Sequence, residues 1–241
     1  MEDLELVARF CFAPNLKKYC GPEVSAKIVD SIFGDFQDSE FLRNAFSKFE
    51  GMFPYLNLIA SSNGKSAFDS EAVQAYWLGN SLLENVKTKD WKEAAFKMLE
   101  NRDWPEEVKQ KYLSQISPNF NPQHSFHAIN TFLHTVKEPE VLLDRFNNCI
   151  ISWGKVLNVE KAELTVVKKQ IILNAGKLEL GEFVVERVKN TPPESSKQLV
   201  DCEKGDFVAM HWGFACKKLS QAELENLQHY TLKNLKEFSL L

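Results

Sequence analysis

Cysteine and histidine are the residues of this 241-residue sequence best suited to hold a transition metal, and there are five of each. Thiolates are soft donors that bind iron, copper and zinc, and imidazoles bind the same metals. No two cysteines are spaced as Cys-x-x-Cys, and their odd number does not suit the paired disulfides of a secreted protein. The candidate ligands are therefore scattered residues: Cys149 and His211 first, then Cys20, His124, His127 and His134.

Cys149 and His211 both fall in segments that we predict to be β-strands. A deprotonated Cys149 could bind a soft metal, helped by a positive charge from Lys155 or from protonated His211. His211 interrupts an apolar run and could be a ligand, a proton relay or a group that orients a ligand. The alternatives are a buried strand cysteine and a histidine packed against Trp212.

The remaining candidates lie in the first part of the chain. Cys20 precedes Pro22, which we expect in the first turn of a helix, where the amides and the helix dipole lower a thiol pKa. It could exchange a metal fragment with Cys149, or it could be a turn cysteine that packs inward. His124, His127 and His134 are separated by three and seven residues, which predicts one face of a helix. They form either a metal-ligand set or a polar stripe.

Two kinds of element must position these residues. Apolar residues recur at spacings of three and four in segments 38–60 and 70–86, and we predict six or seven helices before Asn147. From residue 149 the chain is rich in β-branched residues, and we predict strands over 149–159, 163–173, 178–188 and 207–212. Ser220 and Glu223 form a capping box that predicts a C-terminal helix.

We therefore predict an α+β fold with two domains. Residues 1–147 form an all-helical domain, and residues 148–241 form a small OB-like β-barrel followed by a helix. The net charge of −4 gives no basic excess for nucleic acid. No apolar run approaches the roughly 20 residues that span a membrane, and the acidic N-terminus does not resemble a signal peptide. A cytoplasmic location is expected, and no oligomeric state is predicted.

Two motifs of the last third resemble a known family. Residues 149–156 read Cys-Ile-Ile-Ser-Trp-Gly-Lys-Val, and residues 205–215 read Gly-Asp-Phe-Val-Ala-Met-His-Trp-Gly-Phe-Ala. In order and separation they resemble the HypC/HupF family of nickel–iron hydrogenase maturation chaperones. The resemblance implies a HypC-like barrel in which Cys149 holds iron, as an ion or as an iron–cyanide–carbonyl fragment, with His211 assisting. It implies docking on a maturation scaffold protein or on the hydrogenase large subunit.

The sequence departs from that family at the metal-holding residue. The family cysteine follows the initiator methionine and offers a free amine, whereas Cys149 is internal and has only a peptide nitrogen. Trp153 also stands where the family has proline. A metal on Cys149 therefore needs a substitute donor, and His211 or a residue of the helical domain is expected to supply it.

The whole chain is also similar to an uncharacterised prokaryotic family associated with hydrogenase gene clusters. That similarity implies no activity by itself. It rests on short motifs in four segments, which are residues 9–15, 19–22, 75–80 and 122–127.

The function expected from these features is that of an iron-fragment carrier rather than a catalyst. One alternative is an enzyme whose helical domain makes or delivers a diatomic ligand of the iron at Cys20, His124 and His127. That alternative predicts a small-molecule pocket in the helical domain around Cys20 or His124. The other alternative is an interaction protein without metal.

Overall fold

The structure is a computed structural model that describes residues 2–100 and 102–238. Its helices are α1 (Glu2–Leu16), α2 (Ser25–Ile32), α3 (Ser39–Ser47), α4 (Phe53–Ser62), α5 (Ser70–Leu78), the 3-10 helix η1 (Ser81–Asn85), α6 (Thr88–Glu100), α7 (Glu106–Gln115), α8 (His124–Thr135), α9 (Pro139–Cys149) and α10 (Gln221–Glu237). Its strands are β1 (Ser152–Val159), β2 (Glu163–Asn174), β3 (Lys177–Lys189), β4 (Phe207–His211) and β5 (Phe214–Leu219).

The helical part contains more and shorter helices than predicted. Nine α-helices precede the strands in the described residues, against the predicted six or seven. Segment 38–60, which shows one continuous helical spacing, divides into α3 and α4 around a turn at residues 48–52. Within the described part of the chain, no helix has both the length and the apolar character needed to cross a lipid bilayer.

The strands close into a barrel in the order β1-β2-β3-β5-β4, which confirms the predicted α+β fold class. Neighbouring strands pair antiparallel except at the closure, where β3 meets β5 in parallel at Lys189 and Phe214. Strand β5 was not predicted. Only Trp212 and Gly213 separate it from β4, and both have positive φ, 52° and 80°. A turn of two residues contains too few polar residues to be recognised from the sequence.

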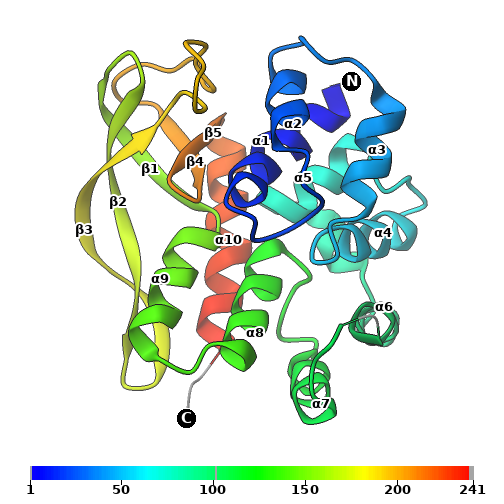
Figure 1. The fold of residues 1–241 in the computed structure, drawn as a ribbon. Coiled ribbons are helices and arrows are strands. Elements are labelled where there is room, and N and C mark those ends of the chain that lie inside the picture. Colours follow the sequence, from blue (N-terminus) through cyan, green and yellow to red (C-terminus); the bar gives the residue numbers. More distant parts are fainter. Residues whose placement is uncertain (1, 101, 239–241) are drawn as a thin grey trace.

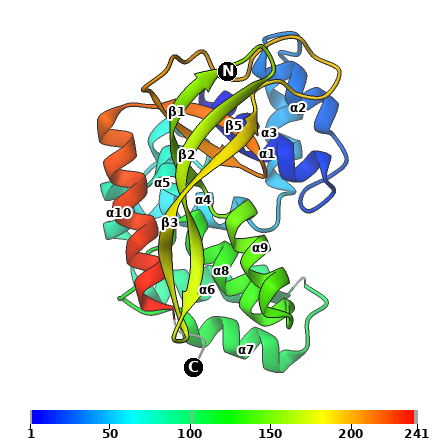
Figure 2. The ribbon, with the colours of Figure 1, turned by 90° about the vertical axis from the view of Figure 1, so that its left-hand side faces the viewer.

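Helix α10 joins the barrel to the helical part. It contacts α5 and α8 on one side and β3 and β5 on the other, and Figures 1 and 2 show it running beside the barrel strands. Its capping box at Ser220 and Glu223 is present as predicted. Helix α1 also packs on β4 and β5. The buried apolar residues of both parts therefore form one continuous core.

A buried amide pair fixes the start of α8 against α10. The side-chain nitrogen of Asn234 donates to the Asn121 carbonyl at 3.1 Å and to Ser125 Oγ at 2.9 Å. The Asn121 N–H donates back to Asn234 Oδ1 at 3.0 Å. Asn234 is fully buried, so an unpaired amide there would be costly. The first turn of α8, which begins at His124, is thereby held in place.

Candidate metal centre

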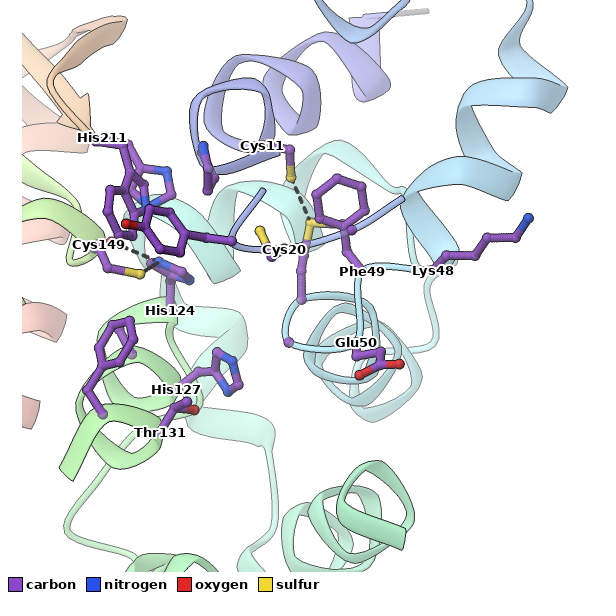
Figure 3. A pocket seen from close by; sticks show the side chains of 18 of the residues that line it. Cys11, Cys20, Lys48, Phe49, Glu50, His124, His127, Thr131, Cys149 and His211 are labelled. Atoms are coloured by element: carbon purple, nitrogen blue, oxygen red, sulfur yellow. Dashed lines mark hydrogen bonds between the residues drawn. The ribbon is translucent and has the colours of Figure 1, made fainter. Parts of the chain in front are cut away.

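Three side chains from three different elements converge on one point. His124 is the first residue of α8, Cys149 is the last residue of α9, and His211 is the last residue of β4. One donor atom from each lies within 4.8 Å of the other two, and Figure 3 shows them together at one side of a pocket. Both first-choice ligands, Cys149 and His211, are therefore brought together, and His124 joins them.

Cys149 does not begin a strand, as predicted, but ends a helix. Pro139 is in the first turn of α9, and Leu142 and Phe146 form its buried face. Ile150, four residues after Phe146, continues this face for one more position and is buried too. The β-branched residues that follow Cys149 suggested an earlier start for the strand, but β1 begins only at Ser152.

The imidazole of His211 presents a lone pair inside the protein. Its Nδ1 lies 2.7 Å from the Phe10 carbonyl oxygen, which can only accept, so Nδ1 carries the proton. Nε2 therefore has a free lone pair, and it is buried with no hydrogen bond of normal geometry among the described residues, although the Cys149 backbone is close enough to raise the pKa of the ring. Burial, with a smaller contribution from His124, holds the pKa of His211 well below its usual value, so the ring is neutral.

His124 contacts both Cys149 and Tyr76. Its Nδ1 lies 3.0 Å from the Tyr76 hydroxyl, and its Nε2 lies 2.9 Å from the Cys149 carbonyl and 3.7 Å from Cys149 Sγ. Burial lowers the pKa of His124 to about 4, although the hydrogen bond to the Cys149 backbone acts in the opposite direction and raises it. This ring is therefore also neutral near pH 7. Without a metal, the carbonyl contact requires the proton on Nε2.

Tyr76 allows the proton of His124 to sit on either nitrogen. Its hydroxyl also lies 3.2 Å from the Gly51 carbonyl oxygen. With Nε2 protonated, Tyr76 donates to Nδ1 of His124. With Nε2 free to bind a metal, Nδ1 donates to Tyr76, which turns its own proton to Gly51. A hydroxyl both donates and accepts, so neither state leaves Nδ1 of His124 unpaired.

The Cys149 thiol is neutral in this setting. Burial raises its pKa above the ordinary value, as does nearby Cys20, while the Trp212 indole and Arg145 lower it to a smaller degree. The Trp212 N–H is itself buried without a hydrogen bond of normal geometry among the described residues. The positive group near Cys149 is therefore Arg145. Lys155 is exposed on β1, and His211 is neutral, so neither supplies the expected charge.

A cavity of about 780 Å³ opens beside the three donors. Its wall includes residues of the helical part and of the barrel, and Figure 3 shows Cys20 and His127 facing it together with the donor residues. Trp212 stacks on Tyr19 at 4.3 Å between ring centroids, and Arg145 lies 4.6 Å from the Tyr19 ring. A pocket around Cys20 and His124 is thus present, but it lies between the helical part and the barrel and not within the helical part as the enzyme alternative predicted.

Cys20 lines the cavity but is not at a helix N-terminus. Helix α2 begins at Ser25, and the Asn15 side chain donates to the carbonyls of Cys20 and Pro22 at 2.8 and 2.6 Å, which holds this segment as a turn. The predicted lowering of its pKa is wrong. The residue is exposed, yet the protein atoms around its sulfur raise the pKa of Cys20 to about 12.

The three histidines of α8 do not form one ligand set. His127 faces the cavity, and its Nδ1 lies 3.1 Å from the Tyr112 hydroxyl, but it is outside the donor cluster. His134 does not line the cavity. It lies about 10 Å further along the helix axis than His127, because each residue rises about 1.5 Å. Sharing a helix face is therefore not enough to share a metal.

The sequence motifs contained a signal for the residues that were missed. Tyr76 and the Phe10 carbonyl support the two histidines, yet neither was a candidate. Both belong to the four motif segments 9–15, 19–22, 75–80 and 122–127, and residues of all four segments line the cavity or contact its histidines. Considered together, these segments would have pointed to one site.

Comparison with known proteins adds one result. A comparison with curated proteins and with solved structures gave no match. The model of a protein family matches residues 2–240, which is almost the whole chain. The chain therefore belongs to DUF6390, a family of unknown function.

Proposed function

We propose that the protein is a cytoplasmic maturation factor for nickel–iron hydrogenase that carries iron on His124, Cys149 and His211. The iron is its cargo, held as an ion or as an iron–cyanide–carbonyl fragment. The protein would dock on a maturation scaffold protein or on the hydrogenase large subunit and pass the iron on. The resemblance of residues 148–241 to the HypC/HupF chaperones supports this role.

The free Nε2 of His211 is the main support for the proposal that a metal binds here. A buried acceptor without a partner costs about 1–3 kcal/mol, and this one lies in a cluster with a thiol and a second imidazole. A metal ion would satisfy the lone pair. The residues present therefore fit a metal, because each offers a donor that soft or borderline ions prefer.

The donor set also suits a metal that carries small ligands of its own. Three protein donors leave coordination positions open, and the cavity beside them provides space. Cys149 is internal and therefore has no free terminal amine. His124 and His211 would supply nitrogen donors in place of that amine. His124 comes from the helical part, where a substitute donor was expected.

Metal analysis of protein isolated anaerobically tests the proposal. About one iron per chain is expected, because all three donors lie in place before the metal binds. Cys149→Ser and His211→Gln should each weaken iron binding about 100-fold or more, since each removes a direct ligand. Cys202→Ser is the control, because this half-buried thiol does not line the cavity. Protein that holds zinc but never iron would contradict the proposal.

The size of the cavity favours a second candidate function. A volume of about 780 Å³ suits an organic molecule better than a bare ion. An enzyme that makes or delivers a diatomic ligand of the iron would use this space for its substrate, with Cys20, His124 and His127 facing it. Production of the protein in a host without other hydrogenase maturation factors separates the two. A carrier should then show no carbonyl infrared band, whereas an enzyme that makes the ligand should show one.

A further inference from the structure

Arg102 is a cation of the cavity wall that has no anionic partner among the described residues. It lines the cavity, and its guanidinium lies 4.7 Å from the centroid of the Trp104 ring. Its Nε is buried with no hydrogen-bond partner, and it forms no salt bridge, within residues 2–100 and 102–238. A buried guanidinium N–H without an acceptor is costly, which points to an oxyanion that is supplied from outside.

Two other residues of the cavity wall can contribute further donors. Thr131 Oγ1 is buried close to the Tyr112 hydroxyl and makes no hydrogen bond of normal geometry in the described part of the chain, and Thr131 lines the same cavity. His127 is neutral, because burial and the charge of Arg102 hold its pKa well below the usual value. Figure 3 shows His127 and Thr131 on the same side of the cavity, next to the donor cluster.

A chain of hydroxyls sets the protonation of His127. The hydroxyls of Tyr55 and Tyr112 are 2.7 Å apart, and Tyr112 lies 3.1 Å from His127 Nδ1. With Tyr55 donating to Tyr112 and Tyr112 donating to Nδ1, each hydroxyl proton is used once. The imidazole proton is then on Nε2, where it can serve a ligand.

The charges of the cavity wall favour an anion of low charge. Lys48 and Arg102 line it against Glu50 and Asp103, and the third cation, Lys18, already pairs with Glu23 at 3.1 Å, so the wall has no excess positive charge. A carboxylate carries one negative charge, whereas a phosphate carries roughly −1.5 to −2 near pH 7. The two acidic residues therefore disfavour the phosphate. The planar guanidinium also matches a carboxylate in a two-point contact.

We propose that the cavity binds a small organic molecule through one carboxylate, held by Arg102 with Thr131 and His127. The rest of the molecule then lies between this subsite and the cluster of His124, Cys149 and His211. The proposal does not depend on iron or on hydrogenase, because all its donors are present in metal-free protein.

Calorimetric titration of the metal-free protein with benzoate and benzamide tests it. The two probes match in size and shape and differ in charge. Benzoate should bind saturably in the millimolar range or below, and benzamide should bind at least about tenfold more weakly. Arg102→Gln should weaken benzoate binding by a similar factor, and Arg102→Lys should restore part of it. Arg43→Gln is the control, because Arg43 is exposed over Phe68, away from the cavity.

Three results would overturn the proposal. These are no saturable binding of benzoate, equal binding of benzoate and benzamide, or unchanged benzoate binding in Arg102→Gln. Inorganic phosphate is the further probe, and tighter binding of phosphate than of benzoate would overturn the carboxylate assignment. Thermal unfolding of each variant checks that it is folded. Because the protein is free of metal, a failure to bind iron would not change these outcomes.

Discussion

One nitrogen of His124 contacts two atoms of Cys149, the carbonyl oxygen at 2.9 Å and the sulfur at 3.7 Å. The first turn of α8 is thereby tied to the last turn of α9, and both ends are fixed in the absence of a metal. The same nitrogen that holds the two helices together is the one that would bind the metal. Metal binding would therefore exchange one interaction of His124 for another without moving its helix.

Tyr76 should tune metal affinity without being a ligand. Tyr76→Phe removes the hydroxyl that accepts the Nδ1 proton of His124 when Nε2 binds metal. We expect about tenfold weaker iron binding, in line with the loss of other partners of metal-bound histidines. Competition with a chelator of known affinity measures this. Unchanged affinity in Tyr76→Phe would show that His124 does not bind through Nε2.

Metal affinity should rise with pH. The Cys149 thiol keeps its proton well above neutral pH because burial raises its pKa, and it must lose that proton to bind a metal. Both histidine ligands are already neutral near pH 7 and release none. One proton is therefore released, and the affinity should rise about tenfold per pH unit between pH 7 and 8. A flat profile would show that no thiolate forms.

The stability of the metal-free protein should fall as the pH drops below about 6.5. There the unfolded chain protonates His124, His127 and His211, while the folded state keeps them neutral because burial lowers their pKa values. The unfolded state thus binds more protons, and acid favours it. Each histidine costs up to about 1.4 kcal/mol per pH unit, and for His124 the loss continues down to about pH 4.

Urea unfolding between pH 5 and 8 measures this effect. The free energy of unfolding should be level with respect to these histidines above pH 6.5 and fall steeply below it. His124→Gln should make the slope shallower, whereas His229→Gln, at an exposed position on α10, should not change it. An equal slope in wild type and His124→Gln would contradict the buried, neutral state of His124.

Gly21 should be needed for the turn that carries Cys20. Its φ of 77° disfavours a side chain, and an added Cβ would collide with the Phe49 ring. Gly34 has nearly the same φ, 75°, but nothing within 4 Å of the added Cβ. Gly34→Ala should therefore cost about 1–2 kcal/mol from the backbone alone. Gly21→Ala should cost about 1–3 kcal/mol more, and equal losses would rule out the Phe49 contact as the cause.

Local sequence patterns predicted the fold class. They did not predict the short turn before β5 or the residue at which β1 begins. Turn residues and β-branched runs located four of the five strands, but the turn at Trp212 and Gly213 was too short to reveal β5. The start of β1 was placed at Cys149 because Ile150 and Ile151 suit a strand. These two residues are instead buried where a helix ends, which depends on packing against other elements.

The three residues of the cluster were named as candidates from their chemistry, but His124 was not grouped with the other two. Cys149 and His211 were named together because both motifs resemble one family. His124 was grouped with His127 and His134 because they share a helix. Its true partners lie 25 and 87 positions away in sequence, and no local periodicity extends that far. The pKa of Cys20 was misjudged for a similar reason, because the Asn15 side chain holds a turn where a helix was expected.

We propose that Cys149, His124 and His211 hold iron for hydrogenase assembly. Infrared spectroscopy tests it most directly, on protein isolated anaerobically from cells that are making nickel–iron hydrogenase. We expect iron together with cyanide and carbonyl bands in the wild-type protein, and loss of both the iron and the bands in Cys149→Ala. Intact bands in Cys149→Ala would contradict the assignment of Cys149, and the absence of iron and of these bands from the wild-type protein would contradict the proposed function.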